Sequence, residues 1–85
     1  MDLTVAPNPF SGVAKMTFEM PEAGEASIQV FNTMGQKMAE PMPRKWLEAG
    51  QQTVDLEAVG LPSGSYFVVL QTSEKRISRA VVALD

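Results

Sequence analysis

The chain of 85 residues contains no cysteine and no histidine. These absences exclude a cysteine nucleophile, a Ser-His-Asp triad and the usual zinc sites, because each needs a thiolate or an imidazole. Disulfides cannot hold the fold together either, so apolar burial must offset an ordering cost on the order of 1.5 kcal/mol per residue. An apolar content of 45% is normal for a globular protein and makes a compact core feasible.

The chain also lacks long apolar runs and concentrated positive charge. Its longest apolar runs are five residues, at 66–70 and 80–84, whereas a membrane helix needs about 20. Seven basic and ten acidic residues are scattered to a net charge of -3, without the basic stripe typical of nucleic-acid binding. The start of the chain has neither the basic region nor the apolar segment of a signal peptide. We therefore expect no transmembrane segment and no nucleic-acid partner.

Six glycines and six prolines divide the chain into short segments with a period of two. Alternation of apolar and polar residues is typical of half-buried strands. The expected strands are Leu3–Val5, Ala14–Met20, Ala26–Phe31, Gln36–Ala39, Gln51–Leu56, Tyr66–Thr72 and Arg79–Leu84. About seven short antiparallel strands at this spacing predict an all-β fold, an Ig-like β-sandwich that forms one domain over residues 1–85.

Several local features of these strands can be predicted. Asn32–Gly35 has the pattern of a hairpin loop, with Asn32 bonding the backbone two residues on and Gly35 at positive φ. Two prolines make Glu40–Arg44 irregular, so Lys45–Leu47 is expected as a separate short edge strand. Five consecutive apolar residues predict that Tyr66–Thr72 is a central strand covered on both faces.

The spacing of the methionines along the strands places four of them in the core. These are Met16, Met20, Met34 and Met38. Phe10 and Trp46 have two interpretations, because each could cover an open end of the sandwich or belong to an exposed patch.

Few residues suggest chemistry. Asp55 and Glu57 point to one face of a strand and could act as an acid–base pair or bind Ca²⁺, but without further carboxylates a solvent-facing pair is favoured. Ser63 lacks the partners of a catalytic serine. We therefore expect no enzyme, no metal and no cofactor. Lys75, Arg76 and Arg79 form a basic cluster at the 73–78 hairpin, which indicates either a solvated tip or contact with an anionic partner.

Six segments, taken in order, resemble a known family. They are Pro7-Asn8-Pro9-Phe10, Met20–Gly24, Ile28–Met38, Ala49-Gly50, Gly60–Phe67 and the final strand Arg79–Leu84. In this order the chain resembles the type A C-terminal sorting domain of type IX secretion cargo proteins from Bacteroidetes. The related Ig-like domain of flagellar hook-capping proteins shares the Leu-Pro-x-Gly-x-Tyr signature. The resemblance covers nearly the whole chain, from about residue 5 to residue 85.

The resemblance implies a monomeric seven-strand Ig-like sandwich at the end of a larger exported protein. Such a domain directs its cargo from the periplasm through an outer-membrane translocon to the cell surface or the medium. A separate sortase-like cysteine peptidase then removes the domain and links the cargo to anionic lipopolysaccharide. The cleavage region would lie at or before residue 5. The domain itself would need a recognition surface and no catalytic group.

The resemblance also assigns candidate site residues. The sorting motifs match Pro7, Asn8, Pro9, Phe10, Gly60, Leu61, Pro62, Gly64 and Tyr66. The candidates for recognition by the translocon are Lys75, Arg76, Arg79, Val81, Val82 and Leu84. One departure is the last residue, since family members often end in Lys or Arg and this chain ends in Asp85.

Each motif also has a purely structural interpretation. For Gly60–Tyr66 we favour a role as a fold determinant, whereas Arg79–Asp85 could equally be read by a partner through main-chain pairing. An alternative function is an Ig-like adhesion or carbohydrate-binding module, with Trp46, Phe10 and Tyr66 as stacking residues. A third is a structural spacer of a surface protein.

Overall fold

The computed structural model describes residues 1–84 and is built of strands, with no helix among those residues. The seven strands are β1 (Leu3–Ala6), β2 (Val13–Met20), β3 (Gly24–Asn32), β4 (Lys37–Leu47), β5 (Gly50–Glu57), β6 (Gly64–Thr72) and β7 (Arg76–Ala83). The predicted all-β fold of seven short strands is confirmed. The departure noted at Asp85 lies outside the described residues.

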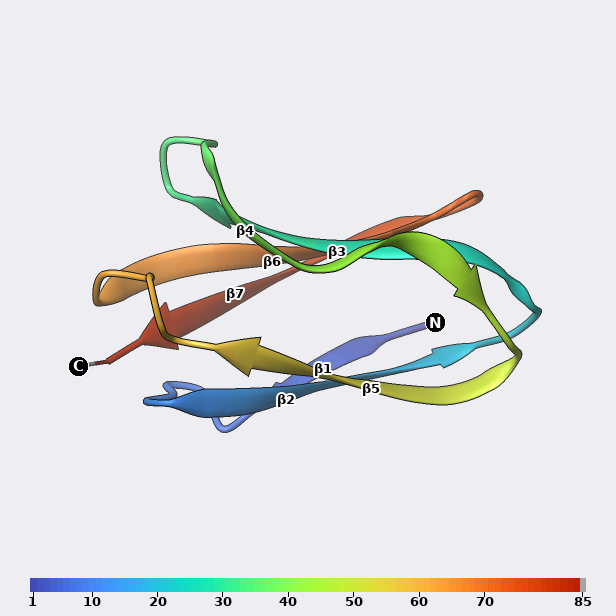
Figure 1. The fold of residues 1–85 in the computed structure, drawn as a ribbon, viewed down its shortest axis with the longest axis horizontal. Coiled ribbons are helices and arrows are strands. Elements are labelled where there is room, and N and C mark those ends of the chain that lie inside the picture. Colours follow the sequence, from blue (N-terminus) through green and yellow to red (C-terminus); the bar gives the residue numbers. More distant parts are fainter. Residues whose placement is uncertain (85) are drawn as a thin grey trace.

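The strands form two antiparallel sheets packed face to face (Figure 1). The smaller sheet has the order β1-β2-β5 and the larger sheet the order β4-β3-β6-β7. These non-sequential neighbours are typical of the Ig-like sandwich, although here the fourth strand lies beside the third rather than in the sheet of the first two. Strand β7, which ends the described chain, is an edge strand of the larger sheet.

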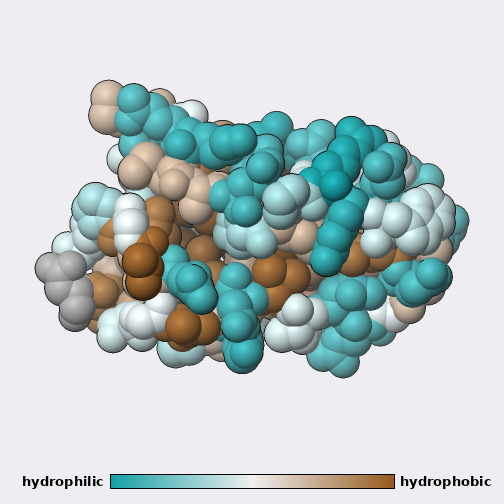
Figure 2. Space-filling view, in the orientation of Figure 1, coloured by the Kyte–Doolittle hydropathy of each residue, from teal (hydrophilic) through white to brown (hydrophobic). Residues whose placement is uncertain are grey.

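The core lies between the sheets because each strand turns alternate residues inward. The inward residues include Met16 and Phe18 of β2, Ile28 of β3, and Val68 and Leu70 of β6, which are 0 to 2% exposed. No polar or charged side chain of residues 1–84 is buried. The space-filling view shows apolar side chains between the two hydrophilic outer layers (Figure 2).

Strand β4 corrects the expectation of a separate strand at Lys45–Leu47. It runs without a break from Lys37 to Leu47, through Pro41 and Pro43. An edge strand tolerates proline because its unpaired side does not need every N–H donor. The pairing of β4 with β3 instead contains register shifts, which take up the irregularity.

Two methionines predicted in the core are not there. Met34 is 81% exposed in the β3–β4 turn, and Met38 is 36% exposed. A register shift between Val30 and Phe31 breaks the alternation on which the prediction for Met38 depended. Met42, further along β4, is the buried methionine of this strand.

Two further predictions concern β6 and the β3–β4 turn. The prediction that β6 is covered on both faces is wrong, because Phe67 on its outer face is 41% exposed. The turn itself is confirmed. The side-chain oxygen of Asn32 accepts hydrogen bonds from the N–H groups of Met34 and Gln36, both at 2.9 Å. Gly35 has φ +84°, a left-handed conformation that glycine adopts without steric cost.

Candidate functional site

The first sorting motif lies along the outer edge of β7, at the end of the sandwich on the left of Figure 1. The Asn8 side chain donates to the carbonyl of Ala80 at 3.1 Å, and its oxygen accepts from the N–H of Val82 at 3.0 Å. A carboxamide carries a donor and an acceptor side by side, as a backbone amide does. Asn8 therefore pairs with β7 in the manner of one peptide unit of a neighbouring strand.

Phe10 continues this pairing through its own backbone. Its N–H donates to the carbonyl of Val82 at 2.9 Å, and its carbonyl accepts from the N–H of Leu84 at 2.8 Å. The two segments run parallel at this bridge. The Phe10 side chain is 1% exposed and belongs to the core cluster. It therefore packs inside the sandwich and cannot be a surface stacking residue.

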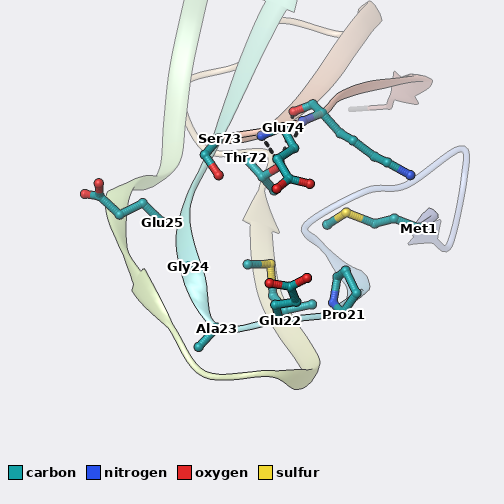
Figure 3. A pocket seen from close by; sticks show the side chains of 11 residues that line it. Met1, Pro21, Glu22, Ala23, Gly24, Glu25, Thr72, Ser73 and Glu74 are labelled. Atoms are coloured by element: carbon teal, nitrogen blue, oxygen red, sulfur yellow. Dashed lines mark hydrogen bonds between the residues drawn. The ribbon is translucent and has the colours of Figure 1, made fainter.

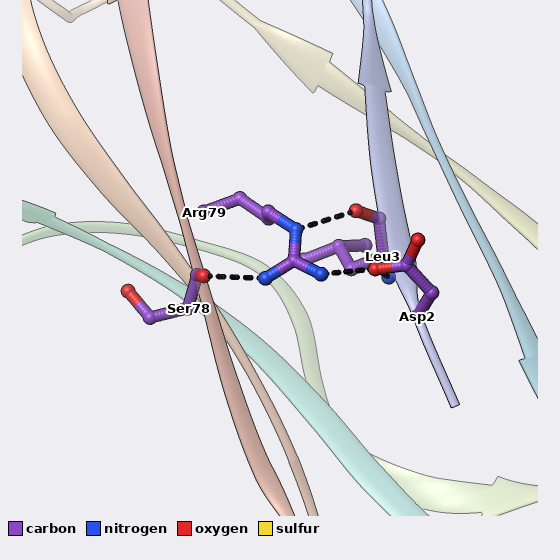
Figure 4. Close-up of polar contacts among 4 residues, drawn as sticks. All are labelled: Asp2, Leu3, Ser78 and Arg79. Atoms are coloured by element: carbon purple, nitrogen blue, oxygen red, sulfur yellow. Dashed lines mark hydrogen bonds and ion pairs between the residues drawn. The ribbon is translucent and has the colours of Figure 1, made fainter.

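Arg79 of β7 bridges to the other sheet (Figure 4). Its Nε donates to the carbonyl of Leu3 at 3.1 Å, its Nη1 donates to the carbonyl of Ser78 at 3.0 Å, and its Nη2 pairs with the carboxylate of Asp2. The hydrogen bond from Arg79 is the main reason that the pKa of Asp2 lies below its usual value. Of the two interpretations of the basic cluster, a solvated tip does not describe Arg79, because this guanidinium joins the two sheets.

Together these contacts occupy the C-terminal half of the outer edge of β7. Successive residues of a strand direct their backbone groups to alternate sides, and the bonds at Ala80, Val82 and Leu84 show that even-numbered residues face away from β6. Every occupied group, from the Ser78 carbonyl to the Leu84 N–H, faces this side. We call residues 2–10 the N-terminal cover, because they supply the partners of Ala80, Val82 and Leu84 and hold Arg79.

The second motif forms a corner between β5 and β6. The Tyr66 hydroxyl donates to the carbonyl of Pro62, four residues earlier. This is the arrangement known as a tyrosine corner in Ig-like sandwiches, in which a tyrosine at the start of the sixth strand bonds the backbone just upstream. Gly60 provides the turn with φ +84°, and Leu61 is buried against the core. The geometry supports a fold-determining role.

The two motifs meet at the same end of the molecule. Gly64, which lies within the corner, is paired with Ala83 at the end of β7. The N–H of Ala58, after β5, donates to the carbonyl of Gly12 at 2.7 Å. Residues of both motifs thus lie near the last residues of β7.

The remaining translocon candidates are spread along β7. Lys75 and Arg76 lie at its other end, roughly 25 Å away for eight residues of strand, and neither forms an ion pair with any of residues 1–84. A shallow pocket lies beside them, between the β2–β3 turn and the β6–β7 hairpin (Figure 3). Val81 is buried, Val82 is half-buried and Leu84 is half exposed.

The residues proposed for other chemistry do not assemble. Asp55 pairs with Lys15 at 2.5 Å, and both side chains are more than half exposed. Among residues 1–84, no group of three or more acidic side chains is placed to hold a metal ion. Of the three proposed stacking aromatics, Phe10 and Tyr66 are buried and Trp46 is 62% exposed, so these three do not form an aromatic platform.

The sequence did not indicate the roles of Asp2, Leu3 and Ser78 in this site. The contacts of Arg79 with Asp2 and Leu3 span 77 and 76 positions of the chain. Local patterns report on neighbours within a few residues, so they carry no signal for such a contact. Only the packing of the two sheets, which places β7 at the edge of one beside β1 at the edge of the other, brings these groups together.

A family model described as "Secretion system C-terminal sorting domain" matches residues 4–83. The chain belongs to this family. It is a sorting signal of type IX secretion, a system that exports proteins to the cell surface or the extracellular space. The sorting domain therefore acts together with the type IX machinery. No curated protein matches the chain. Within residues 1–84 there is no helix long and apolar enough to cross a membrane.

Proposed function

We propose that this sorting domain acts as a monomer without catalysis and guides its cargo from the periplasm through the outer-membrane translocon. The surface that the translocon reads would be β7 together with its N-terminal cover. One observation carries the proposal. The first motif and the terminal strand contact each other although 72 positions separate Asn8 from Ala80, so these two segments lie side by side.

The exposed groups of this surface suit recognition better than the buried ones. Phe10, Tyr66 and Val81 are 1 to 4% exposed and cannot touch a partner without unfolding. Lys75, Arg76 and Leu84 are exposed along the same strand. We therefore assign recognition to the exposed side chains along β7, and we assign the motif side chains to holding that strand in place.

The proposal extends to removal of the domain by a sortase-like peptidase and attachment of the cargo to the cell surface. A protease needs an accessible, extended backbone. Leu3 is paired with Phe18 and is 2% exposed, so a cut within β1 would disrupt the sandwich. We place the cut before Leu3.

A secretion assay tests the proposed function. Residues 1–85 are fused behind a periplasmic reporter in a host with type IX secretion, and the reporter is measured in the medium and on the cell surface. Export of the reporter is the expected result. A reporter that stays in the periplasm with its sorting domain folded would refute the proposal and leave the spacer role.

A pair of charge reversals then tests the recognition surface. Lys75→Glu with Arg76→Glu should reduce export, because the change inverts the charge at one end of β7. The matched control is Arg44→Glu with Lys45→Glu, which makes the same charge change on β4 at the opposite edge of the same sheet. Circular dichroism should show that both double variants are folded. If they are then exported equally, β7 is not the surface that the translocon reads.

A further inference from the structure

We propose that the free edge of β5, together with the groove between β5 and β4, binds an extended peptide in which apolar residues alternate with lysine or arginine. This surface lies on the side of the sandwich opposite to β7, so the inference goes beyond the proposed recognition of that strand. A free strand edge presents a row of unpaired N–H and C=O groups that readily pair with another chain. Nothing in the domain has to move, because no segment of residues 1–84 pairs with this edge.

The two sides at which the sheets meet are closed to different extents. On the β1 and β7 side, Arg79 donates to the Leu3 carbonyl and Phe10 pairs with the end of β7. On the β4 and β5 side, the contacts of residues 1–84 include no hydrogen bond or ion pair between the two strands. These strands lie on the near side in Figure 1, and the same view in Figure 2 shows apolar side chains between the two layers. The β4 and β5 side is therefore the open side of the sandwich.

The backbone of β5 carries the donors and acceptors that strand addition requires. The N–H of Ala58 donates to the carbonyl of Gly12 at 2.7 Å, so the even-numbered residues of this segment direct their backbone groups to β2. The residues whose backbone groups face the free edge are consequently Gln51, Thr53, Asp55 and Glu57. Since β5 contains no proline, unlike β4 across the groove, all four N–H groups can donate to an added strand.

The groove beside this edge has an apolar lining. Ala39 and Pro41 of β4 line it from one sheet, and Leu56 of β5 lines it from the other, together with Val59, which is 87% exposed. Val54 of β5 is half-buried against the core on the same inward face as Leu56. The side chains of an added strand alternate between the two faces as those of β5 do. Every second residue of the peptide would therefore point into this groove and should be apolar.

Charge determines the residues on the other face of the added strand. The charged residues that line the groove are Glu40, Asp55 and Glu57. Asp55 has a cation of its own, Lys15 at 2.5 Å, whereas Glu57 forms no ion pair with any of residues 1–84. A lysine or arginine opposite Glu57 on the added strand would form a cross-strand ion pair. An acidic peptide, or a second copy of this domain with its net charge of -3, would instead bring like charges together.

A peptide titration of the full chain, followed by NMR, tests the edge and the charge. The probe is a ten-residue peptide of alternating valine and lysine, and its control has glutamate in place of lysine. At saturation, hydrogen exchange should slow at least ten-fold at the edge amides of Gln51, Thr53, Asp55 and Glu57. The amides of Val54 and Leu56, which face β2, should be unchanged. Equal Kd values for the two peptides, or protection that is absent from the edge amides, would overturn the proposal.

Two further peptides test main-chain pairing without any change to the protein. Both have the valine–lysine sequence, one with N-methyl groups on the lysine amides and the other with N-methyl groups on the valine amides. In an antiparallel addition the lysine amides face β5, and in a parallel addition the valine amides do. One methylated peptide should therefore bind at least ten-fold more weakly than the parent, and the other should bind like the parent. Equal Kd values for these two peptides would show that β5 does not add a strand.

A pair of variants tests the role of Glu57. Glu57→Gln should raise the Kd of the valine–lysine peptide about three-fold, because a cross-strand ion pair is lost. Glu19→Gln is the matched control, since Glu19 is also exposed, lies on the same face of the same sheet and forms no ion pair with residues 1–84, but belongs to the middle strand β2. Equal Kd values in the two variants would contradict the assignment of Glu57. Dimerisation of the free chain at the titration concentrations, measured by sedimentation, would overturn the peptide as occupant and assign the edge to a second copy.

Discussion

The Tyr66 hydroxyl allows the structural role of the second motif to be measured directly. Tyr66→Phe removes one oxygen and leaves the buried ring, which is 4% exposed, in place. The lost hydrogen bond to the Pro62 carbonyl contributes about 0.5–1.5 kcal/mol net, and leaving a partly buried acceptor unpaired costs about 1–3 kcal/mol. Since water can reach part of this corner, we expect a loss of about 1–2 kcal/mol of unfolding free energy.

Urea unfolding followed by circular dichroism checks this value. With a slope of about 1 kcal/mol/M for a small domain, the midpoint should fall by about 1–2 M. Ser65→Ala is the control, because it removes an exposed hydroxyl beside the corner and should stay within about 0.5 kcal/mol of wild type. A Tyr66→Phe midpoint that falls no further than that of Ser65→Ala would refute the argument.

The same variant separates folding from recognition. If Gly60–Tyr66 is a fold determinant, export of the Tyr66→Phe fusion should follow its folded fraction and be close to wild type well below its melting temperature. Loss of export by a fully folded Tyr66→Phe fusion would contradict this interpretation, because the hydroxyl would then be read by the machinery.

Three further outcomes are expected. Phe10→Ala should lower the unfolding free energy by about 3–5 kcal/mol in urea denaturation, since it empties a fully buried aromatic site. Gly35→Ala should cost about 1 kcal/mol in the same assay, because φ is +84° and a Cβ would meet no atom, so the strain is conformational. Folding lowers the pKa of Asp2 below 3.8, so its contribution to holding the cover is present above about pH 4 and is lost as pH falls through the folded value. An NMR titration of the Asp2 carboxyl should show this lowered pKa, and Arg79→Gln should restore it.

The strands themselves could be read from the sequence because each depends on local alternation. Met16 and Met20 of the strand Ala14–Met20 were predicted to lie in the core, and both are at most 4% exposed. The prediction for Met38 was wrong because the pairing of β4 with β3 decides which face of the sheet its side chain points to. The register shifts in that pairing leave no trace in the spacing of apolar residues. The continuity of β4 through two prolines was missed for a related reason, since only the sheet order reveals that β4 is an edge.

In the site, too, the contact between residues near in sequence could be predicted, and the contact between distant residues could not. The tyrosine corner spans four residues, and a role for Tyr66 in packing was predictable from the motif alone. The pairing of Asn8 with Ala80 and Val82 was not, because the motif itself specifies no partner and the contact crosses the whole chain. Two segments assigned separately to sorting are one structural unit.

The two edges of the larger sheet are protected by different means, and the difference has a functional consequence. Pro41 and Pro43 lie within β4, so the missing donors of that edge cannot be restored by any movement of the domain. Protection of β7 depends instead on the N-terminal cover and on the inward-pointing charge of Arg79, both reversible non-covalent contacts. Of these two edges, β7 alone is covered by another segment, which Leu3 and Phe10 anchor in the core at 2% and 1% exposed. The cover closes the end of this edge against other copies of the domain, whereas the side chains of Lys75 and Arg76 at its start stay accessible to a partner.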